Sequence, residues 1–95
     1  HTDDYRDSVR ERCSGLKEKE TSTEKENDVY YSKHSYTGAL LAAQAAIEGV
    51  RAILGDSSFK RGYCITRPPG HHAKCAEPAG FCFFNNVAIA ARTAR

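Results

Sequence analysis

The sequence is poor in several residue classes, and each shortage narrows the range of functions. It contains no Met, no Trp and only three prolines. No apolar run approaches the roughly 18 residues that a membrane-spanning helix needs. A basic start followed by an apolar block and a small-residue cleavage site, the pattern of a signal peptide, is also missing. The sequence therefore predicts no membrane partner and no secretion.

The charge of the chain is nearly balanced, with 14 Lys and Arg against 12 Asp and Glu. The basic residues are scattered and form no stripe interleaved with aromatic residues, so direct binding of nucleic acid is not predicted. Four cysteines are present, Cys13, Cys64, Cys75 and Cys82. Without a secretory signal, reduced thiols in the nucleus or cytoplasm are favoured over disulfides.

Apolar residues are distributed unevenly along the 95 residues. Residues 1–27 are dominated by charges of both signs, Ser and Thr, which predicts a charged, flexible loop or linker. Residues 34–95 hold nearly all the Leu, Ile, Val, Phe and Ala. A unit of about 60 residues is only marginally stable alone. Because the chain starts with His1 and ends without a recognisable motif, we expect it to be part of a larger protein.

A long amphipathic helix is predicted over Ser35–Leu54. Apolar residues recur there at steps of three and four, which places them on one face. Ser35 is a suitable N-cap, Gly55 a suitable stop, and a turn is predicted over 56–62. The residues of the expected buried face are Tyr36, Leu40, Ala43, Ile47, Val50 and Leu54.

The second half of the sequence predicts a strand, a loop and another helix. Residues 62–66, GYCIT, are short and β-branched, which favours a buried strand. Two prolines near the start of 67–86 indicate a loop, and a helix capped by Asn85 or Asn86 is expected to follow it. This order of elements predicts an α/β fold, with the loop at the carboxyl end of the strand, where such folds place ligand sites.

The loop RPPGHHAKCAEPAGFCFFNN carries two adjacent histidines, His71 and His72. Consecutive side chains tend to point in different directions, so the two rings are a poor pair of metal ligands. A zinc site that combines one of them with Cys75 and Cys82 has unfavourable spacing and lacks an evident fourth ligand. Proton transfer by the two histidines is the better functional hypothesis, since histidine titrates near neutral pH. Two ordinary loop histidines remain the alternative.

The run Gly80-Phe81-Cys82-Phe83-Phe84 also allows two interpretations. Such an apolar run is usually core, yet an aromatic ring beside a glycine can form the wall of a narrow slot for an aliphatic chain. Cys82 with a histidine as its base would make a thiol hydrolase. Since nothing in the sequence lowers the pKa of this thiol, a buried structural cysteine is favoured over a nucleophile.

Taken together, these motifs resemble the histone deacetylase family, most closely its class II members and related acetyl-amide hydrolases. The resemblance rests on Arg67-Pro68-Pro69-Gly70-His71-His72-Ala73 and on Gly80-Phe81-Cys82-x-x-Asn85-Asn86-Val87-Ala88. It implies a fragment of a mostly parallel-sheet, three-layer domain of the arginase and deacetylase type. Residues 28–95 would be the incomplete N-terminal portion of that catalytic domain, whereas residues 1–27 carry no resemblance.

The resemblance also implies a chemistry and a role for each matching residue. In this family a Zn²⁺-bound water hydrolyses the acetyl-lysine amide, flanked by a histidine pair that acts as general base and general acid. His71 and His72 take these roles. Phe81 becomes a wall of the substrate tunnel, Gly80 lines the tunnel beside it, and Asp28 corresponds to the aspartate at the rim that holds the substrate backbone.

The family's metal ligands, a downstream Asp-x-His motif and a further Asp, are not found between Asn86 and Arg95. We therefore expect no metal ligand within this chain and no hydrolysis by it alone. A pseudo-deacetylase interaction module and a small Cys/His zinc module are the alternatives to an enzyme fragment. Histone tails, tubulin-like proteins and acetylated polyamines remain open as substrates of the parent, and co-repressor or cytoskeletal proteins as its partners.

Overall fold

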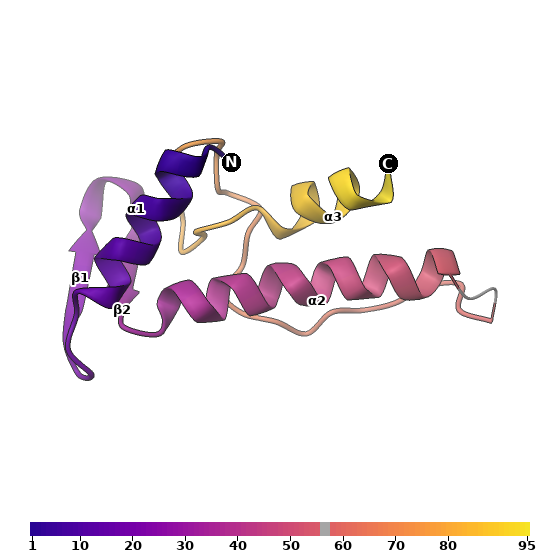
Figure 1. The fold of residues 1–95 in the computed structure, drawn as a ribbon, viewed down its shortest axis with the longest axis horizontal. Coiled ribbons are helices and arrows are strands. Elements are labelled where there is room, and N and C mark those ends of the chain that lie inside the picture. The colour runs from indigo at the N-terminus through magenta and orange to yellow at the C-terminus, as the bar shows by residue number, and fades with distance from the viewer. Residues whose placement is uncertain (56–57) are drawn as a thin grey trace.

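The structure, a computed structural model, describes residues 1–55 and 58–95. Its elements in chain order are α1 (Asp3–Ser14), β1 (Thr21–Glu24), the 3₁₀ helix η1 (Lys25–Asn27), β2 (Val29–Ser32), α2 (Ser35–Gly55) and α3 (Asn86–Ala94). Figure 1 shows α1 and the two strands gathered at one end of the long α2, with α3 beside α2 further along. The result is an elongated body of 45 × 25 × 20 Å.

The first element, α1, forms because its start and its sequence pattern both favour a helix. The hydroxyl of Thr2 accepts a hydrogen bond from the Tyr5 N–H at 3.2 Å, and acidic residues occupy the first turn. Tyr5, Val9 and Cys13 follow at steps of four and are buried on one face. The expectation of a loop over 1–27 is therefore wrong, because three well-spaced apolar side chains are enough to anchor an otherwise charged helix.

The only sheet among residues 1–55 and 58–95 is the antiparallel hairpin of β1 and β2. Val29 and Tyr31 are buried, whereas Tyr30 between them is exposed, as the alternation of a strand requires. The guanidinium of Arg12 lies 4.1 Å from the ring centre of Tyr31 and forms an ion pair with Glu24 at 3.1 Å. This contact ties α1 to the hairpin. The parallel sheet expected from the sequence stays a prediction.

The predicted long helix is confirmed as α2, and the face that it buries matches the expected one only in part. Ala43 is buried as expected, but it is joined by Ala39 and Ala42, whereas Leu40 and Leu54 are exposed. Alanine side chains are small and allow α3 and the neighbouring loop to approach α2 closely. The alanines, rather than the leucines, therefore face the body of the structure. The turn expected over 56–62 includes residues 56 and 57, which lie outside the described residues.

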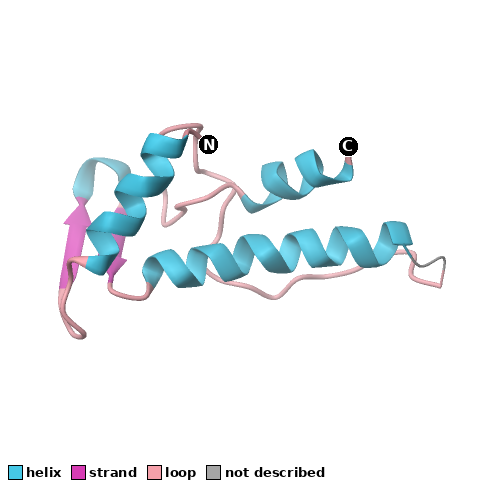
Figure 2. Cartoon of the chain, viewed as in Figure 1, coloured by secondary structure: helices cyan, strands magenta, loops and turns pink. Residues whose placement is uncertain are grey.

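Residues 62–66 were expected to form a buried strand and instead belong to a loop that runs back along α2 (Figure 2). The thiol of Cys64 lies 3.5 Å from the Ala45 carbonyl, while the side chains of Tyr63 and Ile65 are 89% and 90% exposed. A strand requires a neighbouring strand for its backbone hydrogen bonds, and no described strand lies beside this segment. The expectation of a buried strand is therefore wrong for this chain.

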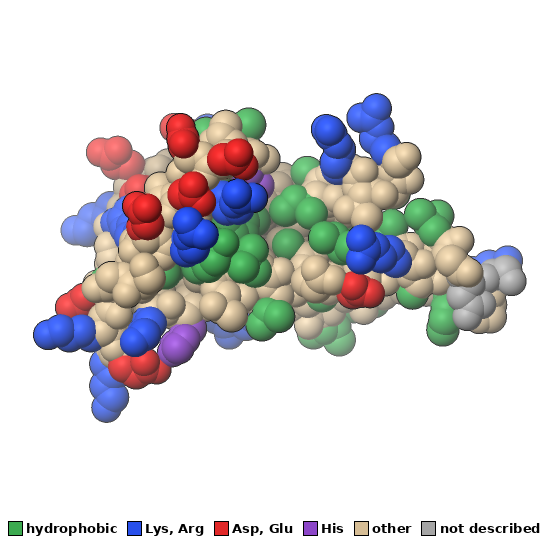
Figure 3. All heavy atoms as spheres, in the orientation of Figure 1, with side chains coloured by type: hydrophobic (Ala, Val, Ile, Leu, Met, Phe, Trp, Pro, Cys, Tyr) green, Lys and Arg blue, Asp and Glu red, His purple; other side chains and the backbone are tan. Residues whose placement is uncertain are grey.

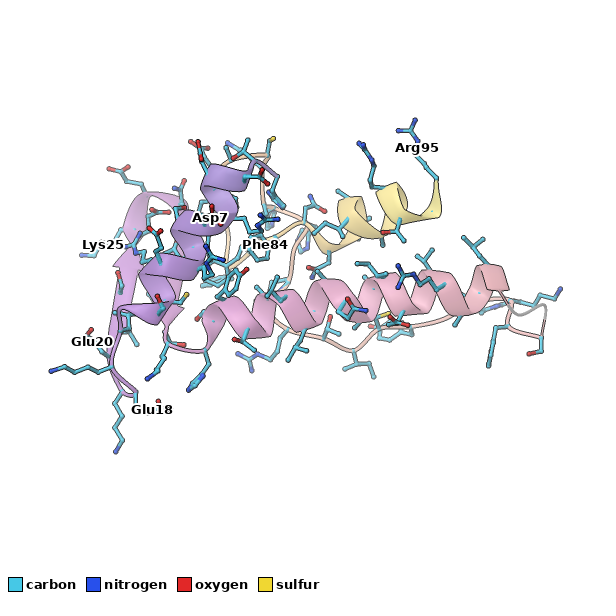
Figure 4. The ribbon with its side chains drawn as sticks, in the orientation of Figure 1. Asp7, Glu18, Glu20, Lys25, Phe84 and Arg95 are labelled. Carbon is cyan, nitrogen blue, oxygen red and sulfur yellow. The ribbon has the colours of Figure 1, made fainter. Side chains whose placement is uncertain are left out.

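The core forms where α1, β2, the start of α2 and residues 83–84 meet. Figure 4 shows Phe84 between α1 and α2, near the start of α3, and its ring contacts Tyr5 and Tyr36 edge-on at 6.1 Å. The Tyr5 hydroxyl donates a hydrogen bond of 2.6 Å to the Phe83 carbonyl. Because burial raises the pKa of Tyr5, this hydroxyl stays protonated and able to donate.

Many large apolar side chains remain on the surface, and Figure 3 shows them along α2, while charged side chains gather over α1. By length and composition alone α2 could also cross a membrane. Core helices of soluble proteins pass the same test, so this observation is weak evidence against the prediction of no membrane partner.

The Tyr5 hydrogen bond predicts a measurable contribution to stability. Tyr5→Phe should lower the free energy of unfolding by about 1 kcal/mol, because it leaves the buried Phe83 carbonyl without this donor. Tyr63→Phe removes the same hydroxyl from a side chain that is 89% exposed and should leave the stability unchanged. Urea unfolding followed by circular dichroism measures both, and equal effects would contradict the role given to Tyr5.

Candidate functional site

The loop that carries the histidines is closed by short backbone contacts around Gly70. The Ala73 N–H donates to the Gly70 carbonyl at 3.2 Å, which makes a turn of residues 70–73. A side chain at Gly70 would place its Cβ 2.5 Å from the Phe84 carbonyl oxygen and 2.6 Å from the Asn86 nitrogen. Only glycine allows this close approach, so the turn is held directly against the start of α3.

Within this turn the two histidine rings lie side by side. The ring centroids of His71 and His72 are 4.3 Å apart at an interplanar angle of 49°, and both side chains are exposed. The expectation that consecutive side chains diverge is therefore wrong here, because it holds for extended strands and these residues lie in a turn. The structure thus brings the two imidazoles together on one side of the turn.

The second part of the loop ends in a tight hairpin turn with Gly80 and Phe81 at its tip. Ala79 and Cys82 exchange backbone hydrogen bonds of 3.1 and 2.9 Å across the turn. Gly80 and Phe81 have φ values of 49° and 66°, and positive φ at both central residues is typical of a type I′ turn. Phenylalanine in this region is strained, and strain of this kind concentrates at functional sites.

Asp28 is joined directly to this turn, although it is distant in the sequence. The Phe81 N–H donates to the Asp28 carbonyl at 2.9 Å, and the Gly80 N–H donates to the Asn27 carbonyl at the same distance. Asp28 and Phe81 are the only non-glycine residues with positive φ in the described part of the chain. Two strained residues, both predicted as substrate-binding from the sequence, are therefore hydrogen-bonded to each other.

Gly80 links the turn to the histidines. A Cβ at Gly80 would lie 2.9 Å from Cδ2 and 3.2 Å from Cγ of His72, so the imidazole packs against the bare glycine backbone. Four of the predicted site residues are thus connected in one chain of contacts: Asp28 to Phe81 by a hydrogen bond, Phe81 to its neighbour Gly80, and Gly80 to His72. His71 joins them through its ring contact with His72.

Asn85 fastens the other end of the loop. Its side-chain oxygen caps α3 by accepting the Ala88 N–H at 3.0 Å, as predicted, and its side-chain amide donates to the Ala73 carbonyl at 3.2 Å. The sequence analysis missed the third contact, in which the Asn85 N–H donates to Nε2 of His1 at 2.9 Å. No local sequence signal connects residues 84 positions apart.

The aromatic side chain of Tyr30 is a further residue of the site that the sequence analysis did not single out. Its ring stacks on Phe81 with centroids 6.1 Å apart and an interplanar angle of 14°. Both rings line a cavity of about 670 Å³ together with Pro68, Pro69 and Phe83. A sequence signal for Tyr30 did exist. Buried and exposed residues alternate along β2, and Tyr30 is an exposed residue two positions after Asp28.

Cys82 is fully buried and its thiol points to the Gly80 carbonyl at 3.3 Å. This burial favours the structural interpretation of Cys82 over the nucleophilic one. Cys75, in contrast, is exposed, and every cysteine of the chain is free. Among residues 1–55 and 58–95, no three His, Cys, Asp or Glu side chains are grouped so that they could hold a metal ion. The residues present therefore do not form a zinc site among themselves.

The packing of Gly80 against His72 predicts that even a methyl group disturbs the site. Gly80→Ala should displace the His72 ring and lower the free energy of unfolding by about 1 kcal/mol, since alanine is strained at positive φ. Gly55→Ala is the matched control, because a Cβ there meets nothing within 4 Å. NMR shifts of the His72 imidazole and urea unfolding measure the two effects, and an undisturbed His72 ring in Gly80→Ala would contradict this contact.

Comparisons with known proteins assign the chain to a family. The family model described as histone deacetylase domain matches residues 1–95. The chain is 36% identical over 96 residues to the polyamine deacetylase HDAC10 of Danio rerio, covering 100% of this chain and 14% of that protein. It is 43% identical over 70 residues to the histone deacetylase HDA1 of Saccharomyces cerevisiae, covering 74% of this chain and 10% of that protein. The chain thus spans only a small part of the curated relatives it matches.

A solved structure is similar over nearly the whole chain. The crystal structure of the HDA15 HD domain superposes with a TM-score of 0.85 at 34% identity, covering 99% of this chain and 25% of that chain. The match includes α1 and the hairpin as well as the histidine loop, so residues 1–27 share the likeness that the sequence analysis gave only to 28–95. The chain belongs to the histone deacetylase family.

Proposed function

We propose that the parent protein hydrolyses acetyl-lysine amides and that this segment supplies the proton-transferring histidines and one wall of the substrate tunnel. The observation that carries the proposal is the chain of contacts from Asp28 through Phe81 and Gly80 to the histidine pair. It joins a carboxylate, an exposed aromatic ring and two imidazoles, which are the groups needed to hold a peptide, grip an aliphatic chain and move protons.

In this proposal His71 and His72 act as general base and general acid. One imidazole removes a proton from the attacking water, and the other delivers a proton to the lysine amine as the amide bond breaks. The contact of 4.3 Å between their ring centroids supports the shared task, since both rings can face one reacting carbonyl. Both side chains are exposed in this chain, so a bound substrate can reach either ring.

Phe81 and Asp28 bind the substrate on either side of their mutual hydrogen bond. The Phe81 side chain is 53% exposed and presents its ring to a lysine aliphatic chain, with Gly80 beside it. The exposed Asp28 carboxylate accepts hydrogen bonds from the substrate backbone. The hydrogen bond of 2.9 Å from the Phe81 N–H to the Asp28 carbonyl fixes the position of the ring relative to the carboxylate. The complete tunnel requires walls from the rest of the parent.

We also propose that the parent is zinc-dependent, with ligands supplied by residues outside this chain. Membership of the histone deacetylase family supports this proposal. The metal would supply Lewis acidity at the amide carbonyl. The groups in this chain would contribute proton transfer and substrate positioning around it. A location in the nucleus or cytoplasm, and co-repressor or cytoskeletal partners, stay predictions.

Acetylated polyamines are a second candidate substrate class. Relatives from fish and rat that match the entire chain are named polyamine deacetylases, at 36% and 41% identity. Relatives named histone deacetylases match at 42 to 43% over shorter stretches. Parallel assays of the parent on an acetyl-lysine peptide and on an acetylated polyamine distinguish the two classes by their kcat/KM.

The proton-transfer role of His72 predicts the effect of its removal in the parent protein. His72→Ala should lower kcat by about 10²- to 10⁴-fold, the usual contribution of general acid or base catalysis, while the zinc content stays normal. Cys75→Ser is the control, because Cys75 is an exposed side chain of the same loop and has no assigned role. Loss of zinc from His72→Ala would make this residue a ligand and refute the assigned role.

The lack of a metal cluster among the described residues predicts the behaviour of the chain alone. The isolated 95 residues, with Zn²⁺ added, should hydrolyse an acetyl-lysine peptide no faster than buffer does. A fluorogenic acetyl-lysine substrate provides the measurement, and the parent protein serves as the positive control. Clear turnover by the chain alone would contradict the proposal that the zinc ligands lie in other parts of the parent protein.

A further inference from the structure

We propose that Tyr30 is a specificity-determining residue, which binds an apolar or aromatic side chain two positions from the acetyl-lysine of a peptide substrate. This inference rests on the proposed deacetylase function and deepens it. The acetyl-lysine itself lies against Phe81 in that proposal. The Tyr30 ring next to Phe81 is half-exposed and belongs to the same surface, so it is available to contact a bound substrate.

The two rings form one continuous apolar face. Tyr30 and Phe81 are 55% and 53% exposed, and their planes differ by only 14° at a centroid distance of 6.1 Å. Nearly parallel rings at this distance are in contact with each other, so no chain passes between them. A bound peptide must therefore lie across the face, touching one ring and then the other.

The placement of this face is rigid. Tyr30 is held by β2, where it pairs with Thr23, while the buried Val29 and Tyr31 on either side fix which way it points. Phe81 is held at the tip of its turn and bonded to Asp28. Both rings thus move as one unit with the carboxylate proposed to hold the substrate backbone. A surface that is fixed relative to the backbone anchor can select a side chain at a fixed position.

The spacing of the rings selects that position. In an extended peptide alternate side chains point to the same side and are about 6.6 Å apart, from a rise of about 3.3 Å per residue. The ring spacing of 6.1 Å corresponds to this separation. With the acetyl-lysine on Phe81, the side chain two residues away reaches Tyr30, whereas the adjacent residue points to the opposite side.

The chemistry of the face decides what it binds. The cavity lined by both rings also contains Pro68, Pro69 and Phe83, and its serine hydroxyls, of Ser32 and Ser35, are hydrogen-bonded to each other. Arg67 and His34 lie at the same cavity, while the Asp28 carbonyl is hydrogen-bonded to Phe81, so the charges nearby are of both signs. The cavity therefore does not favour a peptide side chain of either charge. The interaction that it offers is contact with a flat apolar or aromatic group.

The experiment uses the full parent protein and a series of acetyl-lysine peptides. Leu, Phe or Ser is placed in turn at one and at two positions from the acetyl-lysine, on each side. Binding is measured by fluorescence anisotropy and turnover by amine release. The variants are Tyr30→Ala, which removes the ring, and Tyr30→Phe, which keeps it and removes only the hydroxyl.

We expect the wild-type protein to bind peptides with Phe or Leu two positions away more tightly than the Ser peptide, and Tyr30→Ala to weaken this binding about two- to tenfold. The Ser peptide should lose much less affinity than the Phe and Leu peptides, and Tyr30→Phe should behave as wild type. Equal losses for the Phe and Ser peptides, or a preference at the adjacent position, would overturn the inference. Peptide preference without any turnover would instead refute the deacetylase function and leave the role of Tyr30 standing.

Discussion

Two backbone hydrogen bonds, from Gly80 to Asn27 and from Phe81 to Asp28, join the two segments of the candidate site that are most distant in sequence. They join two segments more than fifty residues apart, and each ends in a residue with positive φ. Without them the exposed ring of Phe81 and the carboxylate of Asp28 would belong to independent loops. With them the strain at both positions is opposed by hydrogen bonds that form only in this arrangement.

The rest of the structure keeps these segments in place. On one side, β2 continues from Asp28 into the core through Val29 and Tyr31, which are buried. On the other side, the chain runs from the turn into Phe83 and Phe84, which pack against α1. Helix α1 therefore supports the site, because its Tyr5 hydroxyl donates a hydrogen bond to the carbonyl of Phe83, two residues beyond the strained turn.

Much of the site could be predicted from the sequence because its motifs are local. Gly70, the adjacent histidines and Gly80 stand within fourteen residues of each other, and proline and glycine restrict the backbone there in known ways. The cap of α3 by Asn85 was predicted for the same reason. The buried strand predicted over 62–66 is a loop in the structure, since β-branched residues show only that a segment can extend. The roles of the site residues stay predictions until they are measured.

The sequence by itself determined the long helix α2, the capped start of α3 and the family, because each depends on spacing within a short stretch. The tertiary structure decided which face of α2 is buried, that residues 3–14 form a core helix, and that the His71 and His72 rings lie together. It also placed Tyr30 on Phe81 and Asp28 beside the turn. These features depend on contacts between distant residues, and no local pattern specifies which segment will supply the partner.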